Sequence, residues 1–325
     1  MASLLENFSS MITPELLAPA AGKLGIDPSV LSKGLGAVVP LLTSGLAKAA
    51  ASPEGLKSVM SLLPAQATDD VAGLTKSVLS SPDAAALMDK FSDTVFGGGA
   101  STATRTVDKA LGFPASGLIP LVAPLVMNGI KKAQATGNLD DQGVAKLLKD
   151  ETDAFLKKGG PEADIVKQSW ANVDKLDALK GKFSAQELAA VGAAPLAVAG
   201  LVMSASKSSA KGMMQELTAL AQSMDAAADR AGGVSLLDMV PRPTAEQAEQ
   251  YLSTPQDSML RTLKAAVAAV SAKAPDQAAG YKAFLNTLAS DVANAAKEGG
   301  FLGIGAKQVT SEEAAVLETI RQAVG

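Results

Sequence analysis

The sequence predicts an all-α fold, with an N-terminal tandem helical repeat of pseudo-twofold symmetry and a C-terminal helical bundle. Apolar residues recur at helical spacing, and a capping residue followed by proline recurs before apolar stretches. Alternating polar and apolar residues, the signal of a half-buried strand, form no sustained pattern in the 325 residues. With 47% hydrophobic residues, the chain has enough apolar surface for about two cores.

A short phrase that occurs twice predicts the repeat. Its pattern, Pro-Leu-x-x-x-Gly-(Leu/Ile)-x-Lys-Ala, spans residues 40–49 and again residues 124–133. A Leu-Gly-(Ile/Phe) block precedes each copy, at residues 24–26 and 111–113. Such spacing is typical of a duplicated supersecondary unit, because each copy keeps its apolar face while its loops change in length.

The proline and the glycine of the phrase each have an expected structural role. Pro40 and Pro124 are expected to start or kink a central helix in each copy. Gly45 and Gly129 are expected to remove a side chain where another backbone approaches closely. We therefore predict that Pro40 superposes on Pro124 and Gly45 on Gly129, with the Leu/Val faces of the two copies buried against each other.

The domain organisation follows from the repeat and from linker chemistry. The copies cover about residues 14–80 and 100–155, within a first domain of residues 1–158. The segment Lys157–Pro161 contains two glycines and a proline, so we expect the domain boundary there. Residues 161–325 are then a C-terminal α-helical domain.

Helix starts are expected where a capping side chain precedes a first-turn proline, since proline there sacrifices no helical hydrogen bond. The capping pairs are Thr13-Pro14, Asp27-Pro28, Ser52-Pro53, Ser81-Pro82 and Thr254-Pro255. Capping-box spacing adds expected starts at Ser184, Thr244 and Thr310.

A third segment is similar to the repeated phrase. The stretch Pro195–Leu201 is either a third, decayed copy of the phrase or a chance match in an alanine-rich helix.

The paired blocks resemble the YidB-like bacterial domain of unknown function. The resemblance covers residues 1–155 and is carried by Leu-Gly-(Ile/Phe) followed by the Pro-Leu phrase. It implies a helical fold and a bacterial origin, and it brings no activity, cofactor or catalytic residue. The segment from Tyr281 to Gly305 is more loosely similar to the ends of other uncharacterised helical bacterial proteins.

The chain contains no histidine and no cysteine. This composition removes the usual ligands of zinc, haem and iron-sulfur clusters, together with Ser-His-Asp and Cys-His catalysis, and no cofactor is expected. A lysine or carboxylate of strongly shifted pKa stays open as a catalyst, and a carboxylate cluster stays open as a magnesium or calcium site. Arginines are isolated and aromatic residues make up 3%, so nucleic acid is not an expected partner.

A glycine-rich loop near the C-terminus is the segment most similar to a ligand site. Its glycines have the spacing of a phosphate-binding loop, but Ala306-Lys307-Gln308 stands where Gly-Lys-Ser/Thr is required. We therefore expect a structural loop, in which a glycine ends one helix and apolar residues enter the core. The residues concerned are Gly299, Gly300, Phe301, Gly303 and Gly305.

Two other patterns receive structural interpretations. The segment Ser204–Lys211 matches Ser-x-x-Lys twice, but the other motifs of a serine-lysine enzyme do not accompany it. Three carboxylate pairs lie in expected first turns, where negative charge complements the helix dipole. These pairs are Asp69-Asp70, Asp140-Asp141 and Glu312-Glu313.

Three uncharged stretches raise the question of membrane contact, at residues 34–47, 110–130 and 188–206. Their prolines, glycines and alanines favour buried core helices, and reversible membrane contact stays open as an alternative. The N-terminus has no basic segment before an apolar stretch, so no signal peptide is expected. A chain without cysteine fits a reducing compartment, and the expected location is cytoplasmic.

For function, the sequence favours a non-enzymatic interaction or scaffold protein, because recognisable catalytic motifs are missing while apolar helical surface is plentiful. Such a protein has a protein partner or self-associates. The first alternative is a membrane-associating or apolar-ligand-binding helical protein. The second is an enzyme that uses lysine, serine or carboxylate chemistry.

Overall fold

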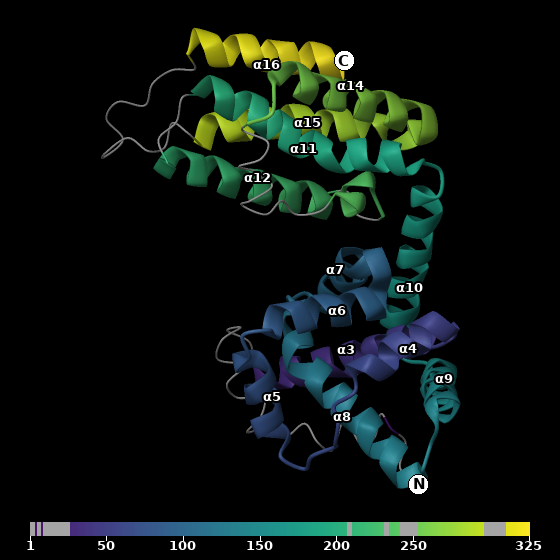
Figure 1. The fold of residues 1–325 in the computed structure, drawn as a ribbon. Helices are drawn as coiled ribbons and strands as arrows, with labels where there is room; N and C mark the ends of the chain where they lie inside the picture. Colours follow the sequence, from purple (N-terminus) through teal and green to yellow (C-terminus); the bar gives the residue numbers. More distant parts are fainter. Residues whose placement is uncertain are drawn as a thin grey trace. The chain divides into compact units, whose positions relative to one another are not determined.

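The computed structural model describes residues 4, 8, 27–206, 210–230, 234–240, 253–295 and 310–325. These residues form α-helices and short 3-10 helices without any strand, which confirms the all-α class (Figure 1). The α-helices are α3 (Pro28–Ala49), α4 (Pro53–Leu62), α5 (Val71–Ser80), α6 (Ala84–Phe96), α7 (Ala100–Leu111), α8 (Ile119–Gly137), α9 (Asp141–Lys158), α10 (Pro161–Lys180), α11 (Ala185–Ser206), α12 (Ala210–Arg230), α14 (Gln256–Lys273), α15 (Pro275–Ala295) and α16 (Ser311–Val324). The 3-10 helices are η1 (Gly97–Gly99), η2 (Ala115–Leu118) and η3 (Leu236–Met239).

Several helices begin where the capping residues predict. α3 begins at Pro28, and α4 begins at Pro53, where the Ser52 hydroxyl accepts a hydrogen bond from a backbone N–H of the first turn. Ser184 and Thr310 each form a capping box, because each hydroxyl accepts the N–H of the glutamate three residues on, whose carboxylate accepts the cap's own N–H. These caps satisfy N–H groups that the helix leaves unpaired.

Two expected starts differ from the structure by one or two residues. α6 begins at Ala84 and not at Pro82, because a turn in which the Asp83 N–H donates to the Ser81 hydroxyl comes first. α14 begins at Gln256, directly after its proline. The starts expected at Thr13 and Thr244 lie outside the described residues.

The chain divides into two compact units, Met1–Asp174 and Lys175–Gly325. The expected boundary at Lys157–Pro161 is the turn between α9 and α10, where Gly159 and Gly160 both have positive φ. The units divide later, inside α10. The reason is that Val166 and Val173 of α10 belong to the hydrophobic core of the first unit.

Helix α3 is the central element of the first unit and packs against α4, α6, α7, α8 and α9. Its Leu42 and Leu46 are fully buried, and Val126 and Ile130 of α8 are buried in the same core. Pro40 lies inside α3 and Pro124 lies inside α8. The two prolines thus occupy similar elements that contact each other, while the superposition of two complete repeat copies stays a prediction.

In the second unit, α11 packs against α14, α15 and α16, and α12 packs against α15. Val198, Leu263, Leu285 and Leu288 are fully buried in this core. The apolar stripes of α14 and α15 therefore face the inside of a helical bundle. Pro195 lies inside α11, as the other two phrase prolines lie inside their helices.

Candidate functional site

An open groove lies on the first unit, between the C-terminal half of α3, one face of α9, and Trp170 of α10. Its volume is about 570 Å³, which is within the usual range of binding sites. It is lined by Ser44, Ala47, Lys48, Ala50, Ala51, Gln142, Ala145, Lys146, Lys149, Thr152, Asp153, Leu156 and Trp170.

The indole ring of Trp170 is fixed from three directions. Its Nε1–H donates to Oγ of Ser44 at 2.6 Å, and Ser44 in turn donates to the carbonyl of Leu41 at 2.8 Å. The ring stacks on Phe96 at 5.9 Å between centroids, and Nζ of Lys48 lies 4.6 Å from the ring centroid. Trp170 is therefore held in one orientation before any partner arrives.

Gly45 allows this arrangement. A Cβ atom at Gly45 would lie 2.7 Å from the carbonyl oxygen of Val95 and 3.0 Å from Cζ2 of Trp170. Both distances are shorter than a normal van der Waals contact, and a carbonyl of the backbone cannot rotate away. The first phrase glycine thus lets α3 approach both the C-terminal end of α6 and the indole of the groove.

The groove is built from two helical stripes with short side chains at their centre. α3 contributes residues 44, 47 and 48, the turn after it contributes residues 50 and 51, and α9 contributes residues 142, 145, 146, 149, 152, 153 and 156. Residues three and four apart lie on one face of a helix, so the residues of each helix form one continuous face. The alanines among them leave space between α3 and α9 next to the indole.

Lysines dominate the charged rim of the groove. Lys48 pairs with Asp174 at 2.8 Å, Lys146 pairs with Asp150, and Lys149 pairs with Asp153. The hydrogen bond to Asp153, and then its charge, raise the pKa of Lys149 above its ordinary value. All three pairs are well exposed, so each contributes little to stability and can exchange with another carboxylate.

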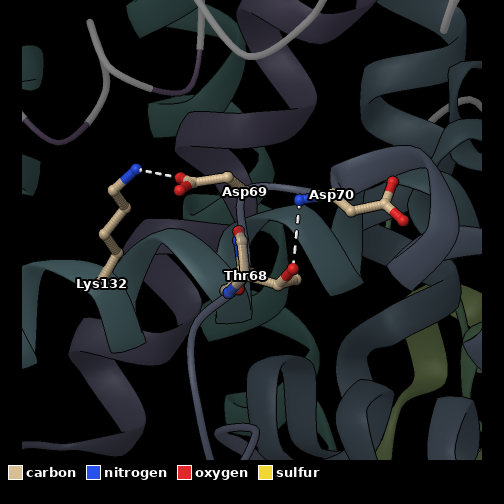
Figure 2. A network of polar contacts seen from close by, with 5 residues as sticks. Thr68, Asp69, Asp70 and Lys132 are labelled. Atoms are coloured by element: carbon tan, nitrogen blue, oxygen red, sulfur yellow. Dashed lines mark hydrogen bonds and ion pairs between the residues drawn. The ribbon is translucent and has the colours of Figure 1, made fainter.

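The second copy of the phrase holds a different segment. Asn128 of α8 is fully buried; its Nδ2 donates to the carbonyl of Thr68 and its Oδ1 accepts the N–H of Thr68, both at 2.9 Å. Four residues along α8, Lys132 pairs with Asp69 at 2.6 Å (Figure 2). This contact fixes the connection between α4 and α5 on the surface of α8.

The carboxylate pair Asp69-Asp70 has two separate structural roles. The hydrogen bond from Lys132, and then its charge, lower the pKa of Asp69. Asp70 caps α5, because its Oδ1 accepts the N–H of Gly73 at 2.8 Å, while its own N–H donates to the Thr68 hydroxyl (Figure 2). Two carboxylates that point to different partners do not share a proton.

Gly129 also faces a close neighbour, which is a ring and not a backbone. A Cβ atom at this position would overlap the ring of Phe8. The remaining predicted site residues, Gly299, Gly300, Phe301, Gly303 and Gly305, lie outside the described residues, as do Lys207 and Ser208 of the Ser-x-x-Lys segment. Among the residues that the structure describes, no group of three or more acidic, histidine or cysteine side chains could hold a metal ion.

A second cavity, of about 460 Å³, lies in the second unit between α12, η3 and α15. The Gln277 side chain accepts the N–H of Leu236 at 2.8 Å, and the Tyr281 hydroxyl donates to the carbonyl of Val191 at 2.9 Å. Burial raises the pKa of Tyr281, so its hydroxyl stays a donor. These polar groups hold elements of the bundle together.

Two helices among the described residues are long and apolar enough to cross a membrane, at Val30–Ala49 and Ala185–Ala205. A bent pair, Ala84–Leu111 with Ala115–Gly137, raises the number to three if it forms one span. Within the protein, 72% and 67% of the first two apolar windows are buried. Their apolar faces are thus largely used in the two cores.

Neither Trp170 nor Ser44 belongs to a site predicted from the sequence. One signal for Trp170 was available: as the single tryptophan of the chain, it lies at helical spacing between Val166 and Val173. A signal for Ser44 was also available: it stands directly before Gly45, and the equivalent position of the second copy, before Gly129, is also polar, Asn128.

A family model described as a bacterial protein of unknown function (DUF937) matches residues 6–133. This region contains both copies of the phrase and ends within α8, and the match is compatible with the YidB-like resemblance. No curated protein and no solved structure matches the chain.

Proposed function

We propose that the protein is a non-enzymatic interaction protein of the bacterial cytoplasm, which binds a segment of a protein partner in the groove of its first unit. The observation that carries this proposal is the pair of helical stripes on α3 and α9 that flank an open groove beside Trp170. Two helices with a groove between them accept the ridge of a third helix, which is a common way to recognise a partner.

The rigid indole supports the same proposal. Tryptophan is enriched among the residues that contribute most to the affinity of protein interfaces. Trp170 is already oriented by Ser44 and Phe96, so binding would not require its side chain to be ordered. A partly exposed tryptophan in one orientation is well suited to contact a partner.

Site-specific photo-crosslinking in native bacterial cells tests this function. A photoreactive amino acid at Ala51, an exposed position in the groove, should give a discrete adduct with a partner protein. The matched control is the same amino acid at Ala86, an exposed position of α6 outside the groove. The Ala145→Arg substitution should remove the Ala51 adduct, because the long side chain fills the groove.

The pattern of adducts decides the outcome. An adduct at Ala51 that is missing at Ala86 and lost in the Ala145→Arg variant supports a docking groove. Identical adducts from Ala51 and Ala86, or none from Ala51, would contradict it.

Membrane association is a second candidate, favoured by the hydropathy of Val30–Ala49 and Ala185–Ala205. Because these helices are largely buried, insertion would require the cores to open. Flotation of the purified protein with liposomes tests this candidate. We expect the protein to stay in the lipid-free fraction, with an unchanged mass in solution when liposomes are present; flotation would favour the membrane role.

A further inference from the structure

We propose that the occupant of the groove is an amphipathic helix with a large apolar anchor flanked by acidic residues. This inference rests on the proposed function and adds the chemistry of the partner segment. Three features of the groove support it: the spacing of its two helical faces, the size of its apolar residues, and the sign of its rim.

The spacing indicates a helix. On α3 the groove residues Ser44, Ala47 and Lys48 follow the i, i+3, i+4 pattern, and the groove residues of α9 continue this spacing over four turns from Gln142 to Leu156. Side chains in this pattern form ridges that pack between the ridges of a facing helix. A partner helix would present residues with the same spacing.

The apolar part of the groove indicates a large anchor. Ala47, Ala51 and Ala145 occupy positions where longer side chains would fill the space, whereas Trp170 and Leu156 are large and bound it. A leucine, methionine or phenylalanine of the partner would occupy this space and cover the exposed part of the indole. Burial of such a side chain is favourable because it removes apolar surface from water.

The rim indicates acidic flanks. Among the charged residues that line the groove, Lys48, Lys146 and Lys149 are cationic and Asp153 is anionic. Each lysine ammonium has three donors and uses a well-exposed ion pair, so a partner carboxylate can join or replace the present one. A basic partner would instead meet the three lysines and find one carboxylate, that of Asp153, among the residues that line the groove.

Trp170 makes the test direct, because the chain contains one tryptophan. Two synthetic amphipathic helices of equal length and the same leucine stripe, one flanked by glutamates and the other by lysines, are titrated into the full-length protein. The glutamate peptide should shift the indole emission saturably. The lysine peptide should bind about tenfold more weakly, since three rim charges each favour the acidic peptide modestly.

Charge reversal tests the rim. The double variant Lys146→Glu and Lys149→Glu should lose or reverse the preference between the peptides. The matched control, Lys76→Glu with Lys90→Glu, changes the net charge equally at exposed positions outside the groove and should keep the preference. Circular dichroism verifies that both variants are folded, and anisotropy of labelled peptides provides a second measurement.

Each other outcome overturns the inference. Equal affinity for the two peptides would show that acidic flanks are not recognised. If laurate shifts the indole emission and neither peptide does, the groove binds an apolar ligand. If no probe shifts it, the groove is not a docking site for a helix. An adduct at Ala51 together with equal peptide affinities would leave the interaction role intact and remove only the acidic chemistry.

Discussion

The two copies of the Pro-Leu phrase each hold a distant segment of the first unit with residues at equivalent positions. The residue before the phrase glycine is Ser44 in α3 and Asn128 in α8, and both are buried. The lysine three residues after the glycine is Lys48 in α3 and Lys132 in α8. Each lysine pairs with an aspartate of the segment that its copy holds, at 2.8 and 2.6 Å.

The copies differ in what the buried polar residue binds. Ser44 accepts one hydrogen bond from the side chain of Trp170, whereas Asn128 binds both backbone groups of Thr68. A contact with backbone groups does not depend on the side chain of the held residue, but a contact with an indole N–H does. In both copies the residue before the phrase glycine therefore binds a distant segment. Asn128 fixes the backbone of a loop, whereas Ser44 fixes one particular side chain, that of Trp170.

The largest expected difference between the copies comes from their glycines. Gly45→Leu should destabilise the first unit by about 3 kcal/mol and Gly129→Leu by about 1 to 2 kcal/mol, because overpacking is relieved more easily by a side chain than by a backbone. The neighbour of Gly45 includes the carbonyl of Val95, whereas the neighbour of Gly129 is the ring of Phe8. Urea unfolding measures both values.

The order of the two effects is the critical result. A larger loss for Gly129→Leu would mean that the Phe8 ring is fixed more rigidly than the α6 backbone. No loss in either variant would mean that the glycines face free space.

The buried polar residues should give a smaller difference. Asn128→Ala should cost about 2 kcal/mol, because the N–H and the carbonyl of Thr68 both lose their partner. Ser44→Ala should cost about 1 kcal/mol, since only the indole N–H is left without its acceptor. Chemical denaturation gives both values, and the Ser44→Ala variant should also change the emission of Trp170. Equal costs would contradict the difference in hydrogen-bond number.

The fold could be predicted from the sequence wherever the cause is local. Pro28, Pro53, Ser184 and Thr310 mark real helix starts, because capping depends on residues within one turn. The helix expected to begin directly after Ser81 begins at Ala84, because a local turn competes there with the first helical turn. The division inside α10 could not be predicted from linker composition, since it depends on which core the α10 side chains enter.

Much less of the groove than of the fold could be predicted from the sequence. Trp170 and Ser44 lie 126 residues apart in the chain, and no local pattern indicates that they meet. The phrase glycines were predicted as points of close approach, yet their neighbours, Val95 and Phe8, come from segments without any recognisable motif. Along α9 the lysines alternate with acidic residues, as on an ordinary solvated helix face, and the packing of α9 against α3 is what places them at a groove.

The smallest expected effect concerns pH. Lys132 lowers the pKa of Asp69, so this pair contributes stability above the ordinary aspartate pKa of about 3.9, and the contribution is lost as pH falls through the lower pKa of the folded state. Burial raises the pKa of Tyr281, so its contribution is complete below about pH 10 and is lost at higher pH. Both changes lie outside neutral pH, and the chain has no histidine.

Stability should therefore be nearly flat between about pH 6 and pH 8, as measured by urea unfolding at several pH values. At acidic pH the two copies of the phrase should behave differently. Lys132→Met should return the pKa of Asp69, followed by the NMR shift of its carboxyl carbon, towards its ordinary value, because the hydrogen bond and the charge that lower it are both removed. Lys48→Met should leave the pKa of Asp69 unchanged, since Lys48 pairs with Asp174 in the other copy. A steep change of stability near neutral pH would reveal a lysine or carboxylate with a strongly shifted pKa, and it would favour the enzyme alternative over an interaction role.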